Sequence, residues 1–208
     1  MSNAAAAERN LAVEAVRVTE ATALAASRRM GHGDEENADR AAVDAMHRAL
    51  SNLYINGTIR IGEGTHEETD RLYAGEQVGS GEGPKVDVAL LPLEGPTIIA
   101  KGEPNGLSVL AMAQEGGFLS APDIYMEKIA VGGGLPAGVV DLDADPGTNL
   151  RELAKARGVD VGDLVVCALD RPRHKELIAR IREAGARIML IGDGDVSGVI
   201  ATTQPDSG

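Results

Sequence analysis

Two short acidic segments are the parts of this chain whose residue types and positions point most directly to chemistry. Residues 61–64 read Ile-Gly-Glu-Gly and contain Glu63, and residues 91–96 read Leu-Pro-Leu-Glu-Gly-Pro and contain Glu94. Each segment follows a run of strand-forming residues and ends in a glycine turn. Together with Asp39, these carboxylates offer the oxygen ligands that Mg²⁺ and Mn²⁺ prefer. The pattern predicts a metal-assisted phosphatase, and its plain alternative is a set of solvated turn residues.

A cationic group comes later in the chain. Arg171, Pro172 and Arg173 follow the apolar run 164–169, and proline is favoured in the first turn of a helix. Guanidinium groups beside the free N–H groups of a helix start favour a phosphate. We therefore expect either a phosphate-binding element or a solvent-facing helix cap at this position.

The segment Asp193-Gly194-Asp195 repeats this arrangement after the apolar run 187–191, where its carboxylates could hold sugar hydroxyls or cap the next helix. Other common site types find no support. The glycine-rich stretch 79–85 has neither dinucleotide-binding nor P-loop spacing. The four histidines and Cys167 lack zinc-site spacing, and no Gly-x-Ser-x-Gly elbow is present.

The composition indicates a globular protein and argues against some classes of partner. The 208 residues are 43% hydrophobic and 25% charged, as in globular domains, and the net charge is −12. This charge argues against a nucleic-acid or anionic-membrane partner, since both need clustered Lys and Arg. A single cysteine in an apolar run is typical of a reduced, cytoplasmic protein. We expect neither a secretory signal peptide nor a membrane-spanning segment, since no apolar run approaches the required length of about 20 residues.

Hydrophobic periodicity predicts an α/β protein with two textures. The first, residues 1–136, combines two helices with a mixed or antiparallel sheet, and the second, residues 137–208, alternates parallel strands with helical crossovers. Together they form one predicted domain over residues 1–208. Helices are expected at 8–30, 38–53, 148–157, 172–184 and 196–203, and strands at 58–61, 86–91, 97–100, 107–113, 129–131, 139–142, 164–169 and 187–191.

Segments spread along nearly the whole chain resemble the class II fructose-1,6-bisphosphatases, metal-dependent sugar phosphatases of gluconeogenesis. The resemblance implies the layered αβαβα architecture that this family shares with inositol monophosphatases. It also implies hydrolysis of the 1-phosphate of fructose 1,6-bisphosphate, giving fructose 6-phosphate, with Mn²⁺ or Mg²⁺ as cofactor. The matching segments are 17–20, 31–39, 41–46, 61–64, 93–95, 121–128, 171–174 and 193–196.

The resemblance further implies roles for individual residues. Metal ligation falls to Asp39, Glu63 and Glu94, and catalysis to Glu63, Glu94 and Glu67. The residues implied in substrate binding are Glu94, Gly95, Pro96, Tyr125, Arg171, Pro172, Arg173, Asp193, Gly194 and Asp195.

Two departures from the family pattern affect the expected activity. The family has Asp-Pro-Leu-Glu-Gly-Thr around Glu94, whereas this chain has Leu91 and Pro96 in place of the Asp and the Thr. Leucine offers no ligand, and proline offers neither a hydroxyl nor an N–H. Thr97 lies one residue further on, where a strand would turn its side chain to the opposite face. Glu67 stands where the family tends to have Asp.

Length is the second departure, because family members continue past residues 205–208 into a glycine-rich segment with another ligand Glu. The expected activity is therefore impaired. Two alternatives stay open: a non-catalytic sugar-phosphate-binding or regulatory homologue, and one half of a split enzyme with its C-terminal part missing and supplied by a complementing segment. A homo-oligomer is also compatible with the sequence.

Overall fold

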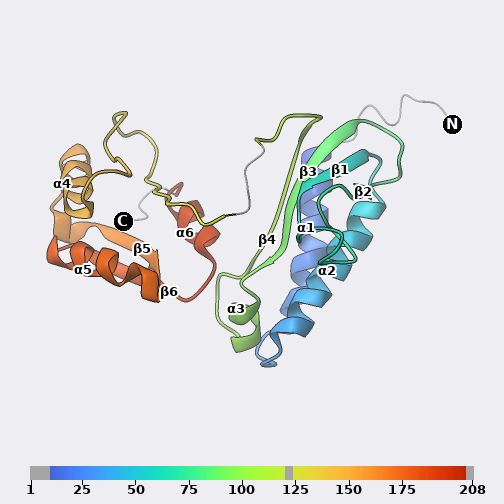
Figure 1. Cartoon of the computed structure of the whole chain (residues 1–208), viewed down its shortest axis with the longest axis horizontal. Helices are drawn as coiled ribbons and strands as arrows, with labels where there is room; N and C mark the ends of the chain where they lie inside the picture. Colours follow the sequence, from blue (N-terminus) through green and yellow to red (C-terminus); the bar gives the residue numbers. More distant parts are fainter. Residues whose placement is uncertain (1–9, 120–123, 205–208) are drawn as a thin grey trace. The chain divides into compact units, whose positions relative to one another are not determined.

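The computed structural model describes residues 10–119 and 124–204 of an α/β chain (Figure 1). The chain divides into two compact units, Met1–Pro122 and Asp123–Gly208. The division comes earlier than the change of texture expected at residue 136, and the grouping of both parts into one domain stays a prediction. None of the helices in the described ranges combines the length and the apolar character needed to cross a membrane.

The first unit begins with a helical hairpin, as predicted. Helix α1 spans Leu11–Ser27 and α2 spans Glu35–Ser51. The Asp34 side chain accepts a hydrogen bond from the Asn37 N–H at 2.9 Å, so α2 starts at this cap rather than at residue 38. Gly31 and Gly33, both with φ of +72°, form the turn between the helices.

A mixed four-stranded sheet packs against this hairpin, in agreement with the prediction. Its order is β2 (Gln77–Val78), β1 (Asn56–Ile61), β3 (Lys85–Glu94) and β4 (Leu107–Gln114). The β1–β3 pair is parallel and the other two pairs are antiparallel. Helices α1 and α2 cover one face of the sheet (Figure 1). The core between them contains Val18, Met46, Leu50, Leu53, Ile55, Ile59, Leu72, Val78, Val86, Val88 and Leu90.

The strand predicted at residues 97–100 is wrong, because these residues belong to helix α3 (Pro96–Lys101). Gly95 has a left-handed backbone with φ of +86°, and Pro96 occupies the first turn, where proline costs no hydrogen bond. A short apolar run does not distinguish a buried strand from a buried helix turn. Thr97 therefore lies in a helix, and the alternation of side chains along a strand does not set the direction in which it points.

The second unit contains the predicted alternation of helices and parallel strands. Strands β5 (Val165–Leu169) and β6 (Arg187–Ile191) pair in parallel, and α4 (Pro146–Arg157) ends at the left-handed Gly158, as expected. The helix predicted at 172–184 is a 3₁₀ turn, η2 (Pro172–His174), followed by α5 (Lys175–Glu183). The remaining elements are the 3₁₀ turn η1 (Val161–Asp163) and helix α6 (Asp195–Ala201).

Two predicted strands of this unit are wrong. Residues 129–131 and 139–142 contain apolar residues but form no strand. A strand needs a neighbour to pair its backbone N–H and C=O groups, and the described sheet of this unit consists of β5 and β6 alone. Short runs between glycine and proline turns therefore stay irregular here.

Replacement of Leu50 by Ala tests the core between the hairpin and the sheet. Leu50 is fully buried, so Leu50→Ala should lower the free energy of unfolding by about 3 kcal/mol in urea denaturation. Leu24, which is 63% exposed on α1, provides a matched control, and Leu24→Ala should change it by less than about 1 kcal/mol. Equal losses for the two variants would contradict this assignment of the core.

Candidate active site

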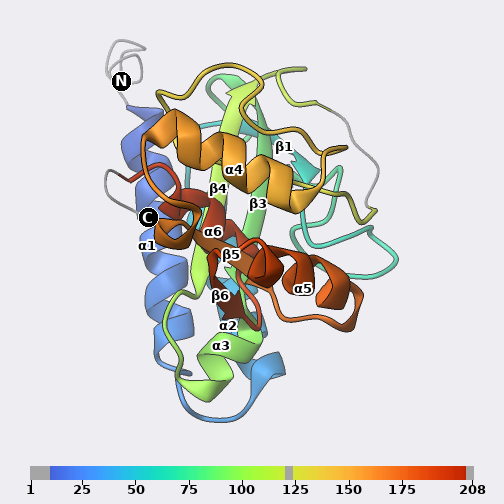
Figure 2. The same cartoon turned by 90° about the vertical axis from the view of Figure 1, so that its left-hand side faces the viewer.

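A small apolar cluster joins the elements that carry two of the predicted ligands. Ala38 and Ala42 of α2 pack with Leu93 of β3 and Ile99 of α3. The Gly31 and Gly33 N–H groups donate to the Ile99 and Ala100 carbonyls, both at 2.9 Å, which fastens α3 to the turn of the hairpin (Figures 1 and 2). Asp39 directly follows Ala38, and Glu94 directly follows Leu93. The packing therefore anchors both acidic residues at one end of the unit.

The parallel pairing of β1 and β3 places Glu63 and Glu94 beyond the same edge of the sheet. Ile61 is the register partner of Ala89, so Glu63 comes two residues after this row and Glu94 comes five. The difference of three residues corresponds to roughly 10 Å along an extended strand. Both residues thus lie toward the same edge of the sheet, and Glu94, the last residue of β3, lies further along the strand direction than Glu63.

An irregularity in β3 decides which way Leu91 and Glu94 face. Leu91 pairs with Val109 and Glu94 with Leu107, so three steps on β3 match two steps on β4. The extra residue brings Leu91 and Glu94 to the same face of the sheet. Leu90 is in the core beneath the helices, so that shared face is the opposite one. Leucine therefore occupies the position from which a carboxylate would extend on the side of Glu94.

Two of the three predicted metal ligands interact electrostatically. Burial, with a smaller contribution from the negative charge of Asp39, raises the pKa of Glu63 to about 7. Burial also raises the pKa of Asp39. Within residues 10–119 and 124–204, neither carboxylate has a hydrogen-bond or ion-pair partner. Two partly buried, unpartnered carboxylates repel each other, and a divalent cation between them would remove the repulsion.

The donor set fits Mg²⁺ or Mn²⁺ in part. The described residues contain no group of three or more His, Cys, Asp or Glu side chains placed to hold a metal ion. Sites for Mg²⁺ commonly use one or two carboxylates and leave the other positions to water and substrate phosphates. The Asp39–Glu63 pair offers two such carboxylates, and metal ligation by Asp39, Glu63 and Glu94 stays a prediction.

The turn after β1 holds Glu67 at the surface. Glu67 is exposed, and its neighbour Glu68 makes the local contacts instead, accepting from the Thr65 N–H at 2.8 Å and the Thr65 hydroxyl at 2.9 Å. The hydrogen bond from the Thr65 N–H is the main cause that lowers the pKa of Glu68. The implied catalytic role of Glu67 therefore rests on the resemblance alone.

In the second unit, the predicted substrate residues follow the carboxyl ends of two neighbouring parallel strands. Arg171 comes after β5 and Asp193 after β6, and the Asp170 N–H donates to the Ile191 carbonyl at 2.8 Å between these ends. Ligands of parallel α/β sheets commonly bind beyond the carboxyl edge. The described structure therefore brings the loops of Arg171 and Asp193 together.

Two further contacts order this edge. The Arg173 guanidinium carbon lies 4.8 Å from the centroid of the Tyr125 ring, a cation–π distance, although the Tyr125 side chain is 90% exposed. The Asp193 carboxylate accepts from the Gly194 N–H at 3.0 Å, and Gly194, with φ of +77°, precedes the first helical residue, Asp195. Pro172 begins the 3₁₀ turn η2, with Arg171 immediately before the turn and Arg173 within it.

Sequence reasoning missed the residues that surround Glu63 in the first unit. The Glu63 N–H donates to the carbonyl of Leu72, whose φ is +59°, and the Leu72 N–H donates to the Glu76 carboxylate, which also contacts His47. A left-handed leucine has no sequence signal, because glycine and asparagine are the usual residues in that conformation. Only the fold shows this arrangement.

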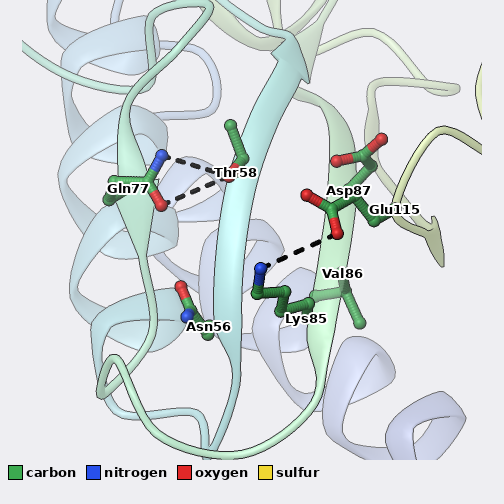
Figure 3. Close-up of a pocket in the computed structure, with 7 residues that line it drawn as sticks. All are labelled: Asn56, Thr58, Gln77, Lys85, Val86, Asp87 and Glu115. Carbon is green, nitrogen blue, oxygen red and sulfur yellow. Dashed lines mark hydrogen bonds and ion pairs between the residues drawn. The ribbon is translucent and has the colours of Figure 1, made fainter.

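A polar hollow of about 240 Å³ lies away from these residues, at the amino ends of β1 and β3 (Figure 3). Most of its polar side chains have partners: Thr58 hydrogen-bonds with Gln77, and the Lys85 Nζ lies 3.9 Å from the Glu115 Oε2. Asp87 accepts from the Gly116 N–H at 2.7 Å and from Arg60 at 2.9 Å, and the Gly116 bond is the main cause that lowers its pKa. The hollow therefore offers few free groups to a ligand.

Comparisons with known proteins agree with the resemblance described for the sequence. A family model described as "Bacterial fructose-1,6-bisphosphatase, glpX-encoded" matches residues 9–208. "Fructose-1,6-bisphosphatase 1 class 2" of Escherichia coli is 47% identical over 199 residues, which cover 96% of this chain and 59% of that protein. "Fructose-1,6-bisphosphatase class 2" of Shigella flexneri matches with the same identity and coverage. The chain thus spans 59% of the length of these curated relatives.

The raised pKa of Glu63 predicts how stability depends on pH. Between its ordinary value of 4.5 and about 7, the folded chain keeps a proton that the unfolded chain has released. The free energy of unfolding should therefore fall as pH rises through this window. In urea denaturation with EDTA, Glu63→Gln should be more stable than wild type at pH 8 by about 1 kcal/mol, a value reduced for solvent screening, and equal to it at pH 4.

The exposed Glu82 provides the control, since Glu82→Gln removes the same charge from a surface turn. Identical pH profiles for wild type, Glu63→Gln and Glu82→Gln would contradict the electrostatic account of the Asp39–Glu63 pair.

Proposed function

Since this chain belongs to the bacterial class 2 fructose-1,6-bisphosphatase family, we propose that it acts on fructose 1,6-bisphosphate by descent, as a phosphatase of its 1-phosphate. Its helices and mixed sheet are consistent with the α/β sugar-phosphatase fold of that family. The chain matches 59% of the length of these relatives, so the activity of the whole enzyme is a proposal for this chain.

Asp39 and Glu63 carry the proposal: both pKa values are raised, and among the described residues neither carboxylate has a hydrogen-bond or ion-pair partner. We propose that they hold Mn²⁺ or Mg²⁺, with Glu94 as a further ligand. A divalent ion, when bound, polarises the phosphoryl oxygen and makes water a better nucleophile. Both acids must be ionised to bind it, so metal affinity should increase with pH.

The protein groups would bind the substrate and move the proton. Arg171 and Arg173 would hold a phosphate, and the exposed ring of Tyr125 keeps the Arg173 guanidinium in place. The carboxylates of Asp193 and Asp195 would accept hydrogen bonds from sugar hydroxyls, beside Gly194, and Gly95 and Pro96 would line the substrate next to Glu94. One of the carboxylates of Glu63, Glu94 or Glu67 would take the proton of the attacking water.

Two substitutions are expected to impair catalysis without disturbing the fold. Leu91 lies on the face shared with Glu94 and supplies no ligand there, while Pro96 fits the first turn of α3 but supplies no hydroxyl. Loss of a single stabilising donor or metal-site group commonly costs about 10²-fold in rate. We therefore propose a weak phosphatase with a preserved framework.

A second candidate function is binding of a sugar phosphate without turnover, as in a regulatory homologue. The contact between Arg173 and Tyr125 favours it, because the second unit contains an arginine suited to phosphate, whereas Leu91 and Pro96 of the first unit supply neither a ligand nor a hydroxyl. A homo-oligomer is a third arrangement that we propose. In each case we propose a reduced, cytoplasmic setting, which suits the free thiol of Cys167.

Phosphate release tests the leading proposal. The wild-type chain should release phosphate from fructose 1,6-bisphosphate slowly with Mn²⁺ and not with EDTA. The double change Leu91→Asp and Pro96→Thr restores a carboxylate on the face of Glu94 and a hydroxyl at the start of α3, and it should raise the rate by about 10²-fold or more. No turnover in either protein would contradict the phosphatase proposal.

Isothermal titration calorimetry separates the second candidate from the first. Binding of fructose 1,6-bisphosphate without phosphate release would support a binding protein. Arg173→Gln should weaken this binding by about tenfold, because it removes a charge-assisted phosphate contact. Arg182→Gln, at an exposed position of α5, should leave it unchanged. Absence of heat with the wild-type chain would contradict both candidates.

A further inference from the structure

We propose that Glu76 is a positioning residue that holds Glu63 in place through the backbone of Leu72. The inference rests on the proposed role of Glu63 as a metal ligand. It assigns a function to Leu72, which hydrogen-bonds to the Glu63 backbone, and to Glu76 and His47, which follow Leu72 in a chain of contacts.

The Leu72 residue links Glu76 to Glu63. Its N–H donates to the Glu76 carboxylate, and its C=O accepts from the Glu63 N–H at 2.9 Å. The orientation of this one residue therefore sets where the chain leaves β1 and where Glu63 lies. A change in the Glu76 carboxylate reaches Glu63 through two hydrogen bonds.

Leu72 adopts a backbone conformation that it would not adopt alone. Its φ is +59°, in the left-handed region that a bulky side chain disfavours. The side chain is fully buried among the core residues, so packing and the hydrogen bond from the Leu72 N–H to the Glu76 carboxylate together hold the residue there. Backbone strain of this kind is concentrated at functional sites. The strain gives Glu76 a specific task that a surface carboxylate does not have.

The close approach of Gly62 to Leu72 shows how tightly this connection is fitted. A Cβ atom on Gly62 would lie 2.1 Å from the Leu72 carbonyl oxygen and 2.9 Å from the Ile59 Cγ2. Any side chain at position 62 would displace the Leu72 carbonyl, which accepts the hydrogen bond from the Glu63 N–H. The glycine of the acidic motif therefore serves the contact with Leu72.

Helix α2 connects Leu72 and Glu76 to Asp39, the other carboxylate of the pair. His47 of α2 places its Nε2 3.1 Å from the Glu76 Oε1, and Asp44, one turn earlier, forms an ion pair with Arg71 beside Leu72. The same helix carries Asp39, eight residues before His47, which is about 12 Å along the axis. One rigid helix thus positions Asp39 directly and Glu63 through His47, Glu76 and Leu72.

The test measures Mn²⁺ affinity and protection of the Glu63 amide in the full 208-residue chain. Glu76→Ala removes the acceptor of the Leu72 N–H, so Mn²⁺ binding followed by electron paramagnetic resonance should weaken about 10-fold to 100-fold. Glu76→Gln keeps an acceptor oxygen and should restore affinity to within about threefold of wild type. Glu82→Ala, in an exposed turn, should bind Mn²⁺ as wild type does.

Hydrogen exchange of the Glu63 amide distinguishes a failure of this inference from a failure of the proposed function. Exchange should be faster in Glu76→Ala than in wild type and Glu82→Ala. If wild type binds no Mn²⁺, the proposed metal site is wrong, and the amide exchange alone decides whether Glu76 holds Glu63. If Glu76→Ala leaves exchange or Mn²⁺ affinity unchanged in the folded protein, the inference is overturned.

A variant with a smaller change guards against loss of folding in Glu76→Ala. His47→Ala keeps the Glu76 carboxylate but removes its support, and it should weaken Mn²⁺ binding about threefold to tenfold with circular dichroism unchanged. A folded His47→Ala chain with wild-type affinity and wild-type exchange at Glu63 would also overturn the inference.

Discussion

The repulsion between the Asp39 and Glu63 carboxylates is the interaction on which this account depends. Burial raises both pKa values, and the negative charge of Asp39 adds a smaller contribution at Glu63; among the described residues no cation compensates the two carboxylates. A fold gains no stability from such a pair, since two partly buried like charges favour protonation over ionisation. We propose that a divalent cation occupies the space between the carboxylates, which would give the pair a function.

The rest of the first unit brings these acids together from distant parts of the chain. The apolar cluster of Ala38, Ala42, Leu93 and Ile99 joins α2, β3 and α3, and the bulge in β3 turns Leu91 and Glu94 to one face. These features persist although Leu91 and Pro96 have replaced the family's Asp and Thr. Leucine suits a half-buried strand position and proline suits a helix start, so both changes are compatible with the fold. The fold therefore accommodates leucine and proline at these two positions.

The sequence predicted the elements that have strong local signals. Hydrophobic periodicity and glycine stops predicted the two long helices, the strands that begin at Leu107 and Arg187, and the helix that ends at Gly158. The predictions failed at residues 97–100, 129–131 and 139–142, where short apolar runs fit more than one structure and tertiary pairing decides the outcome. The grouping of Asp39 with Glu63 was predicted from residue types and positions and was strengthened by the resemblance, whereas the support from Leu72 and Glu76 depends on a backbone conformation that the sequence does not mark.

The most direct test of the central claim is anomalous X-ray scattering from crystals of this chain soaked in Mn²⁺. The account predicts an anomalous peak in contact with the carboxylates of both Asp39 and Glu63, and loss of that peak in Glu63→Gln. A fully soaked crystal with no peak at this pair, or with Mn²⁺ bound only elsewhere, would contradict it.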